Sequence, residues 1–288
     1  MSDLIEMDNT YVDRIQLRRR IMRDHEGDAI AANPIIKPAV NELYTWMMET
    51  YLPRRFPRVY QLTLAPGSLY PVLFNTATKE TLSVAPPPTP VEALKILGGS
   101  IDCEFLLLLP TAEEGKYRLE GFVTCFPSGF NTRLKLGLNL AGIHGPVPGY
   151  AAKLEKSMDR FFAALPVGKV VKRANWSITT NRDLFVLSGN HGYESEADGV
   201  SGREDEEVDV EQCVVRCERQ TLHRLPESKA LVFAFKTYQY PLRHIKDEGS
   251  AEDLCEAIDG LPGGSTPKMA VYKRQVVWGE PVKAYLRS

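Results

Sequence analysis

His144 is the residue of this chain whose surroundings best suit a metal ligand. The sequence has five histidines, so each can be judged by its neighbours. An apolar stripe at Leu136, Leu140 and Ile143 precedes it, and the sequence Gly-Pro-Val-Pro at 145–148 follows it. Glycine leaves clearance beside the imidazole, and the prolines restrict the exit path of the chain. Haem iron requires such a ligand, a neutral imidazole nitrogen whose partner nitrogen is fixed by a hydrogen bond. The alternative is a histidine that hydrogen-bonds the last carbonyl groups of its own helix.

The other histidines and the cysteines do not form a second metal-binding pattern. Two histidines lie in charged stretches predicted at the surface and two in polar, turn-like contexts: His25, His191, His223 and His244. The five cysteines lack CxxC spacing, which argues against a disulfide framework and a zinc or iron-sulfur site. Cys213 and Cys217 would lie about 13 Å apart on a strand, too far to share a metal. Buried, reduced thiols are therefore predicted.

Two predicted strands carry polar residues on a defined face. In the segment 170–179, Arg173 and Asn175 share one face, because side chains alternate along a strand. In the segment 213–222, Arg219 lies on an otherwise apolar face. A buried, unpaired guanidinium is costly, so Arg219 needs an anion. A protein carboxylate or a cofactor carboxylate, such as a haem propionate, would supply it.

Apolar periodicity predicts the secondary structure. A two-residue repeat predicts strands at 101–109, 116–126, 170–179, 213–222 and 230–238, the first two joined as an antiparallel hairpin. Helical spacing predicts helices at 36–52, 91–97, 132–143, 149–165 and 241–259. The tract 190–210, rich in Gly, Ser, Glu and Asp, is predicted to be a surface loop. The fold class is therefore α+β, an antiparallel sheet of about five strands with helices on one face.

A run of prolines at 86–88 and 90 marks a boundary in the chain, because proline interrupts helices and central strands. Residues 1–85 are predicted to be a helical N-terminal extension packed on the core. Residues 86–288 are predicted to be the sheet-containing domain, and the two parts form one continuous structural unit.

Composition and charge exclude several classes of function. The 35 basic residues nearly balance the 37 acidic ones, so no global field attracts nucleic acid or an anionic membrane. The N-terminus is charged and lacks the apolar region of a secretory signal. The longest apolar stretch, 105–109, is too short to cross a bilayer. We expect a cytoplasmic protein with a small molecule or another protein as its partner.

Several motifs resemble, in order, those of the haem-dependent oxidative N-demethylase alpha-subunit family. The family's helical lead-in is similar to Tyr11–Arg20 and Leu52–Pro57. The later motifs are Ile143–Pro148, Arg173–Trp176, Glu218–Pro226, Lys236–Tyr238 and Val271–Lys273. The resemblance covers nearly the whole chain. His223 and the acidic loop at 190–210 depart from the family pattern. Either could alter the entrance to the binding pocket that the resemblance implies.

The resemblance implies a PAS-like sheet that holds haem b in an enzyme that oxidises a small secondary amine with molecular oxygen. His144 would be the proximal iron ligand. Arg173 and Arg219 would contact the propionates or line a polar pocket, with Asn175 and Thr237 as further cofactor contacts. Arg219 and Tyr238 are the candidates for catalytic roles. A separate reductase is implied, because the sequence has neither a CxxC iron-sulfur pattern nor a GxGxxG turn.

Two alternatives remain open at the level of sequence. A haem-binding sensor or carrier could share the fold without turnover, since fold does not fix function. A metal-free PAS-like pocket could instead bind an organic ligand or a partner protein.

Overall fold

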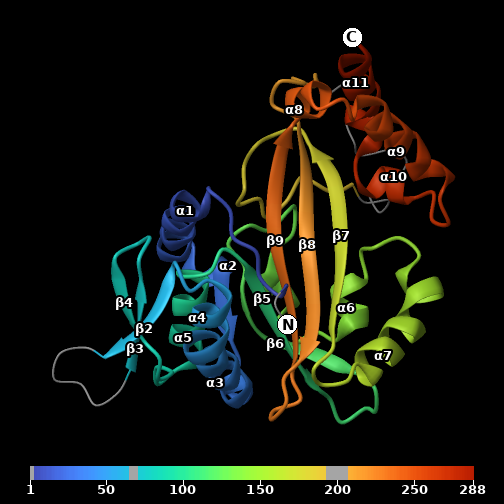
Figure 1. Cartoon of the computed structure of the whole chain (residues 1–288). Helices are drawn as coiled ribbons and strands as arrows, with labels where there is room; N and C mark the ends of the chain where they lie inside the picture. The colour runs from blue at the N-terminus through green and yellow to red at the C-terminus, as the bar shows by residue number, and fades with distance from the viewer. Residues whose placement is uncertain (1–2, 65–70, 193–206) are drawn as a thin grey trace.

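The main element of the fold is a six-stranded antiparallel sheet with the strand order β1-β6-β5-β9-β8-β7 (Figure 1). The computed structural model describes residues 3–64, 71–192 and 207–288. The strands are β1 (Ile30–Ala32), β5 (Glu104–Pro110), β6 (Tyr117–Val123), β7 (Val170–Thr179), β8 (Val214–Arg224) and β9 (Leu231–Pro241). The five predicted strands are thus confirmed, each within three residues at either end. Most of the predicted loop at 190–210 lies outside the described residues.

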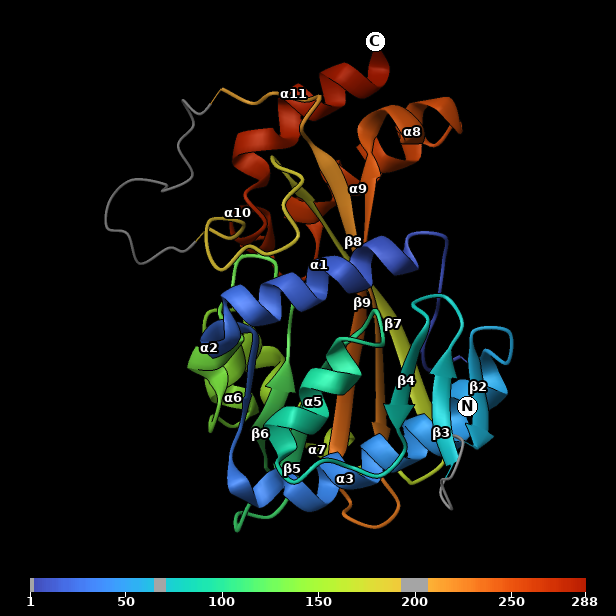
Figure 2. The same cartoon turned by 90° about the vertical axis from the view of Figure 1, so that its left-hand side faces the viewer.

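Helices cover both faces of this sheet, so the prediction of helices on one face is wrong. The helices α1 (Tyr11–Asp24), α3 (Lys37–Thr45) and α5 (Pro90–Gly98) lie against one face (Figure 2). The helices α6 (Leu140–His144) and α7 (Glu155–Ala164) pack against the other. The reason is visible in β5, where Phe105 and Leu107 pack against the first group of helices while Leu106 and Leu108 pack against the second. A strand that is apolar on both sides needs a cover on both sides.

The N-terminal segment, predicted to be a helical extension, contains strands as well as helices. It supplies β1 to the main sheet and forms a second antiparallel sheet of β2 (Tyr60–Leu64), β3 (Pro71–Asn75) and β4 (Glu80–Ser83). Its other elements are α2 (Glu26–Ala29), the short 3-10 helix η1 (Pro34–Ile36), the π-helix η2 (Trp46–Tyr51) and α4 (Leu52–Arg55). The largest hydrophobic core joins this segment to β5, β6 and β9. The division of the chain at residue 85 stays a prediction.

The remaining helices surround the ends of the long strands. The connection from β6 to β7 contains the 3-10 helix η3 (Thr132–Lys135), α6, the π-helix η4 (Tyr150–Leu154) and α7. After β9 come α8 (Leu242–Asp247), α9 (Ala251–Gly263), α10 (Met269–Tyr272) and α11 (Gln275–Arg287). Apolar side chains of α8, α9 and α11 form a second core with the ends of β7 and β8. The cysteines are free, as predicted, and four of the five are buried.

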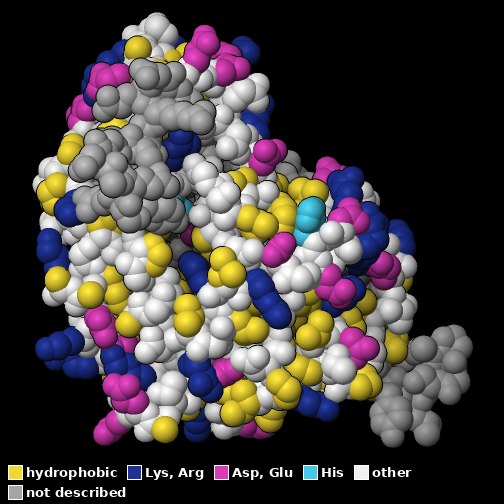
Figure 3. Space-filling view, turned by 180° about the vertical axis from the view of Figure 1, so that it is seen from behind, with side chains coloured by type: hydrophobic (Ala, Val, Ile, Leu, Met, Phe, Trp, Pro, Cys, Tyr) yellow, Lys and Arg dark blue, Asp and Glu magenta, His cyan; other side chains and the backbone are white. Residues whose placement is uncertain are grey.

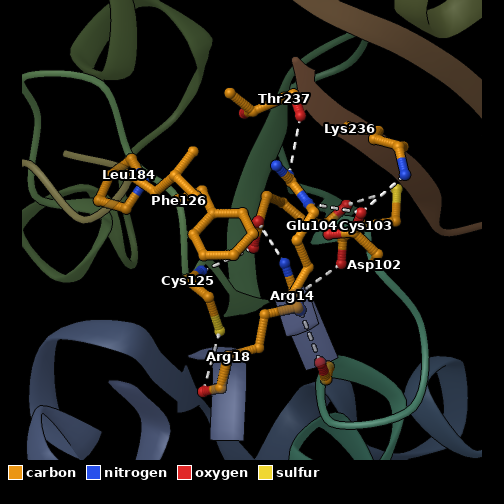
Figure 4. A network of polar contacts seen from close by, with 12 residues as sticks. Arg14, Arg18, Asp102, Cys103, Glu104, Cys125, Phe126, Leu184, Lys236 and Thr237 are labelled. Atoms are coloured by element: carbon orange, nitrogen blue, oxygen red, sulfur yellow. Dashed lines mark hydrogen bonds and ion pairs between the residues drawn. The ribbon is translucent and has the colours of Figure 1, made fainter. Parts of the chain in front are cut away.

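A buried ion network fastens α1 to the main sheet (Figure 4). The guanidinium of Arg18, with no exposed side-chain surface, pairs with Glu104 and donates to the backbone oxygens of Gly98 and Cys103. Glu104 on β5 is only 1% exposed, because its carboxylate meets this cation from α1. The local sequence of the strand does not show that partner.

Neighbouring residues of the same network repeat this arrangement. Arg14 contacts the carboxylate of Asp102 at 2.7 Å and donates to the backbone oxygen of Thr237 at 2.8 Å. Lys236 on β9 reaches the same Asp102 oxygen at 2.7 Å and Asp8 at 3.0 Å. The lead-in motif Tyr11–Arg20 therefore acts in this fold by anchoring α1 onto β5 and β9.

The surface of the protein mixes charges of both signs. On the face seen in Figure 3, basic and acidic side chains are interspersed, with hydrophobic side chains scattered among them. Within the described part of the chain, no helix has both the length and the apolar character that crossing a membrane requires.

Candidate haem site

The short helix α6 presents His144 at its last residue. The helix begins where the side chain of Asn139 accepts a hydrogen bond from the backbone N–H of Gly142, at 2.9 Å. Leu140 anchors the helix in the core under this face of the sheet. The chain then turns through Gly149, whose φ of 72° favours glycine, and this turn brings Tyr150 against the histidine. The two rings stack with centroids 4.6 Å apart.

The imidazole of His144 is neutral, and one of its two ring nitrogens makes no hydrogen bond to a described residue. Its Nδ1 lies 2.9 Å from the backbone oxygen of Leu140, so Nδ1 carries the hydrogen and Nε2 the lone pair. Burial lowers the pKa of His144, and the nearby charges of Lys135 and Arg173 lower it further. No hydrogen bond joins Nε2 to a described residue. The bond to Leu140 is the one expected of a helix-end histidine, and it is also the one that orients a metal-ligating imidazole. Because Nε2 has a lone pair and no described hydrogen-bond partner, we favour the interpretation of His144 as a metal-ligating imidazole.

Four cations without a described carboxylate partner lie in this region: Lys135 and Arg173, whose charges act on His144, and Arg216 and Lys273, which share the acidic neighbour Glu218 with Lys135. Burial lowers the pKa of Lys135 to about 8, that of Arg216 to about 10, and that of Lys273 as well. None of the four has a described carboxylate within 4 Å. Their common acidic neighbour is Glu218 on β8, whose charge raises the pKa of Lys135, Arg216 and Lys273. The cluster therefore has an excess of positive charge, which an anionic ligand would balance.

The strand register sets a row of polar residues beside these cations. Asn175 on β7, Glu218 on β8 and Thr237 on β9 lie opposite one another, so their side chains share a face. This is the face on which Leu222, also on β8, packs with the residues of α6. The hydroxyl of Thr237 is buried and has no hydrogen-bond partner among the described residues.

The next row along the strands continues this polar face. The Nε of Arg173 donates to Gln220 Oε1 at 2.5 Å, and Gln220 donates to Glu218 Oε2 at 2.8 Å. These contacts orient Glu218 and Arg173. The structure thus places Arg173, Asn175 and Thr237 on the face of the sheet that α6, the helix of His144, covers.

Arg219 and Tyr238 lie on the opposite face of the sheet. Arg219 pairs with Ala174, and Tyr238 pairs with Cys217. Each directly follows a residue of the polar row, so its side chain points to the other face. Both contact Glu6 of the N-terminal segment, at 2.9 Å from Arg219 Nε and 3.0 Å from the Tyr238 hydroxyl. The anion that the sequence required for Arg219 is thus a protein carboxylate. The structure does not bring these two candidates to His144.

Sequence reasoning missed Lys135, Glu218 and Lys273. The last two belong to motifs that carry the family resemblance, which was the available signal. His191 was predicted to be solvated at the surface, but its ring stacks on Tyr272 with centroids 4.5 Å apart. Burial lowers the pKa of His191 to about 4. His223, predicted in a polar turn, is likewise buried, at 4% exposure.

These residues fit haem better than a bare metal ion. In the described ranges, no three His, Cys, Asp or Glu side chains gather as a metal-binding group. A porphyrin supplies its own equatorial ligands, so one imidazole can complete the protein's contribution to the iron. Its propionates would balance the cations of the cluster.

The fold and these residues define an α+β protein with a cluster of cations that lack described carboxylate partners. Beside this cluster lies His144, whose Nε2 makes no hydrogen bond to a described residue. The chain matches the family model for haem-dependent oxidative N-demethylase, alpha subunit-like, over residues 1–283. It belongs to this family, and the resemblance found in the sequence is confirmed.

The cluster predicts that haem affinity depends on pH. With a pKa of about 8, Lys135 is charged at pH 7 and loses its charge as the pH rises above 8. Only the charged form attracts a carboxylate, so we expect haem to bind roughly three- to tenfold more weakly at pH 9.5 than at pH 7. Soret titrations at both pH values would measure this. The variant Lys135→Met should show a smaller pH dependence, whereas the exposed control Lys156→Met should behave like the unmodified protein.

Proposed function

We propose that this protein binds haem b, whose iron His144 would hold, and oxidises a small amine with molecular oxygen. The observation that carries the proposal is that Nε2 of His144 has no described hydrogen-bond partner and that Lys135 and Arg173, two cations without a described carboxylate partner, act on this histidine. The family name supports haem dependence and oxidative N-demethylation. We include a PAS-like description of the fold in the proposal. It is supported by the strand order: counting β5 to β9 as one to five, the sheet runs 2-1-5-4-3.

Each part of the site has a physical task in this proposal. Bound haem would supply the redox chemistry of oxygen. The bond from His144 Nδ1 to Leu140 keeps the ring in one tautomer with Nε2 available. Lys135, Arg173 and Lys273 would hold the propionates through charge-assisted hydrogen bonds.

The polar row would orient the amine. A protonated amine carries a positive charge and N–H donors, which match the carboxylate of Glu218. Asn175 and Thr237 flank that carboxylate in the register, and the unpartnered hydroxyl of Thr237 adds a hydrogen-bonding group. We place the substrate here rather than beside Arg219 and Tyr238, because those two side chains are engaged by Glu6.

Electrons for the reaction would come from a separate reductase. The sequence offers neither the CxxC pattern of an iron-sulfur centre nor the GxGxxG turn of a dinucleotide site. The proposal therefore includes a protein partner as the electron donor.

The test is to record the absorption spectrum of the freshly purified protein and then to measure oxygen consumption by the reduced protein. We expect a Soret band, together with oxygen and electron-donor consumption that rises when a secondary amine such as dimethylamine is added. A Soret band whose position responds to amines without turnover would favour a sensor or carrier. Absence of haem binding after reconstitution would favour a metal-free pocket and end the proposal.

A further inference from the structure

A pocket lies on the opposite face of the sheet from His144. Its volume is about 510 Å³, and it lies between α3 with η2 on one side and the end of β8, the turn after β8 and residues 167–168 on the other. One wall is a helical face, on which Glu42, Trp46 and Glu49 follow one another at four- and three-residue spacing. The wall includes the start of the π-helix η2, a helix type that is frequent at functional sites. His223 on β8 lies in the other wall.

His223 is buried in this wall, and no described residue forms a hydrogen bond with its ring. Its exposed fraction is 4%. Burial lowers the pKa of His223 to about 4, so at neutral pH the ring has one N–H donor and one acceptor. The side-chain oxygen of Asn41, also in the pocket wall, is buried without a partner. Buried polar groups are normally paired, so two neighbouring ones that are unpaired indicate a ligand. Both groups can accept a hydrogen bond from that ligand.

The charged residues around the pocket indicate the sign of the charge that its ligand carries. Glu42, Glu49 and Glu227 line the pocket, and none of them has a described lysine or arginine within 4 Å. Glu42 accepts hydrogen bonds from the backbone N–H groups of Glu227 and Ser228, at 2.7 and 2.8 Å, which fixes its carboxylate at the pocket.

The basic residue of the lining does not change this balance. The guanidinium of Arg224 is directed to α7, where it donates to the backbone oxygens of Phe162 and Leu165 at 2.6 and 2.7 Å. The indole of Trp46, whose centroid lies 5.9 Å from that of His223, offers an aromatic face. Aromatic rings and carboxylates together attract organic cations.

We propose that this pocket binds a small organic ammonium ion of the alkylamine class. The carboxylates and the Trp46 ring would attract the charge, and the N–H groups of the ligand would donate to Asn41 and to the acceptor nitrogen of His223. The site is separate from the iron chemistry proposed above, because the sheet lies between them. It is a binding site for a second amine molecule, and it does not depend on the haem proposal.

The experiment is a tryptophan-fluorescence titration of the full-length protein with butylamine, which is cationic at pH 7.5. We expect saturable binding with a dissociation constant on the order of 1 mM, as a ligand of this size allows. The neutral isostere 1-butanol should bind at least tenfold more weakly. Tetramethylammonium, a cation without N–H groups, should also bind more weakly than butylamine. Equal responses to butylamine and 1-butanol, or no response to butylamine, would overturn the proposal.

Variants separate this pocket from the iron. His223→Phe keeps the ring shape but removes both nitrogens, and Glu49→Gln removes one charge at the exposed rim. Both should weaken butylamine binding, His223→Phe by at least tenfold and Glu49→Gln by about threefold. Glu256→Gln, an exposed change on α9, is the matched control and should have no effect. If His223→Phe does not fold, the butylamine titration of Glu49→Gln still tests the proposal. The response should persist in His144→Ala, and its loss there would assign the binding to the haem site and overturn the proposal.

Discussion

Replacing His144 with alanine is expected to lower amine-dependent oxygen consumption at least 100-fold and to change the Soret band. In our proposal this imidazole is the protein's own bond to iron, and its Nδ1 is already fixed by the backbone oxygen of Leu140. Removing an oriented ligand changes the electronic state of the iron and loosens haem. The measurements are the absorption spectrum, the haem dissociation constant and the oxygen uptake rate of the variant.

Two controls distinguish ligation from a general structural effect. His244→Ala changes an exposed histidine on α8 and should leave spectrum and rate unchanged. Free imidazole added to His144→Ala should restore part of the spectrum, because the deleted side chain leaves space for it. A His144→Ala protein with an unaltered Soret band and full turnover would remove His144 from the proposed site.

The strands of the main sheet could be predicted because their period is a local property. β7, for example, begins at Val170 and ends at Thr179, as its alternation predicts. The second sheet could not be predicted in this way. Its strands have four or five residues each, and β4 buries none of them fully, so little apolar alternation marks it. The apolar run in β5 did contain the information that both faces are covered, because Leu106 and Leu108 interrupt the alternation.

The site shows a similar division between local and long-range information. His144 could be selected from its neighbours in the sequence, and the face shared by Arg173 and Asn175 followed from strand geometry. The partner of Arg219 could not be chosen, since Glu6 comes from the other end of the chain. For the same reason the cation cluster was missed: Lys135 and Lys273 come from distant segments and meet only when the chain folds.

Replacing Arg18 with methionine is expected to produce the largest loss of stability among single changes in α1, about 3–5 kcal/mol. The change leaves Glu104, 1% exposed, without its counter-ion. It also leaves the backbone oxygens of Gly98 and Cys103 without the guanidinium donor. A buried charge or carbonyl group that loses its partner keeps the cost of its desolvation. Urea denaturation would measure the effect as a lower midpoint with an unchanged slope.

A double variant tests whether charge burial is the cause. Glu104→Gln added to Arg18→Met removes the stranded charge while keeping an acceptor for the backbone N–H of Cys125, which now donates to Glu104 at 2.6 Å. We expect the double variant to be more stable than Arg18→Met alone. Arg23→Met, on the exposed side of the same helix, should be indistinguishable from the unmodified protein, since its side chain is 70% exposed. If Arg18→Met and Arg23→Met behave alike, the network is not what holds α1 to the sheet, and the apolar contacts of Ile15 and Met22 must do so instead.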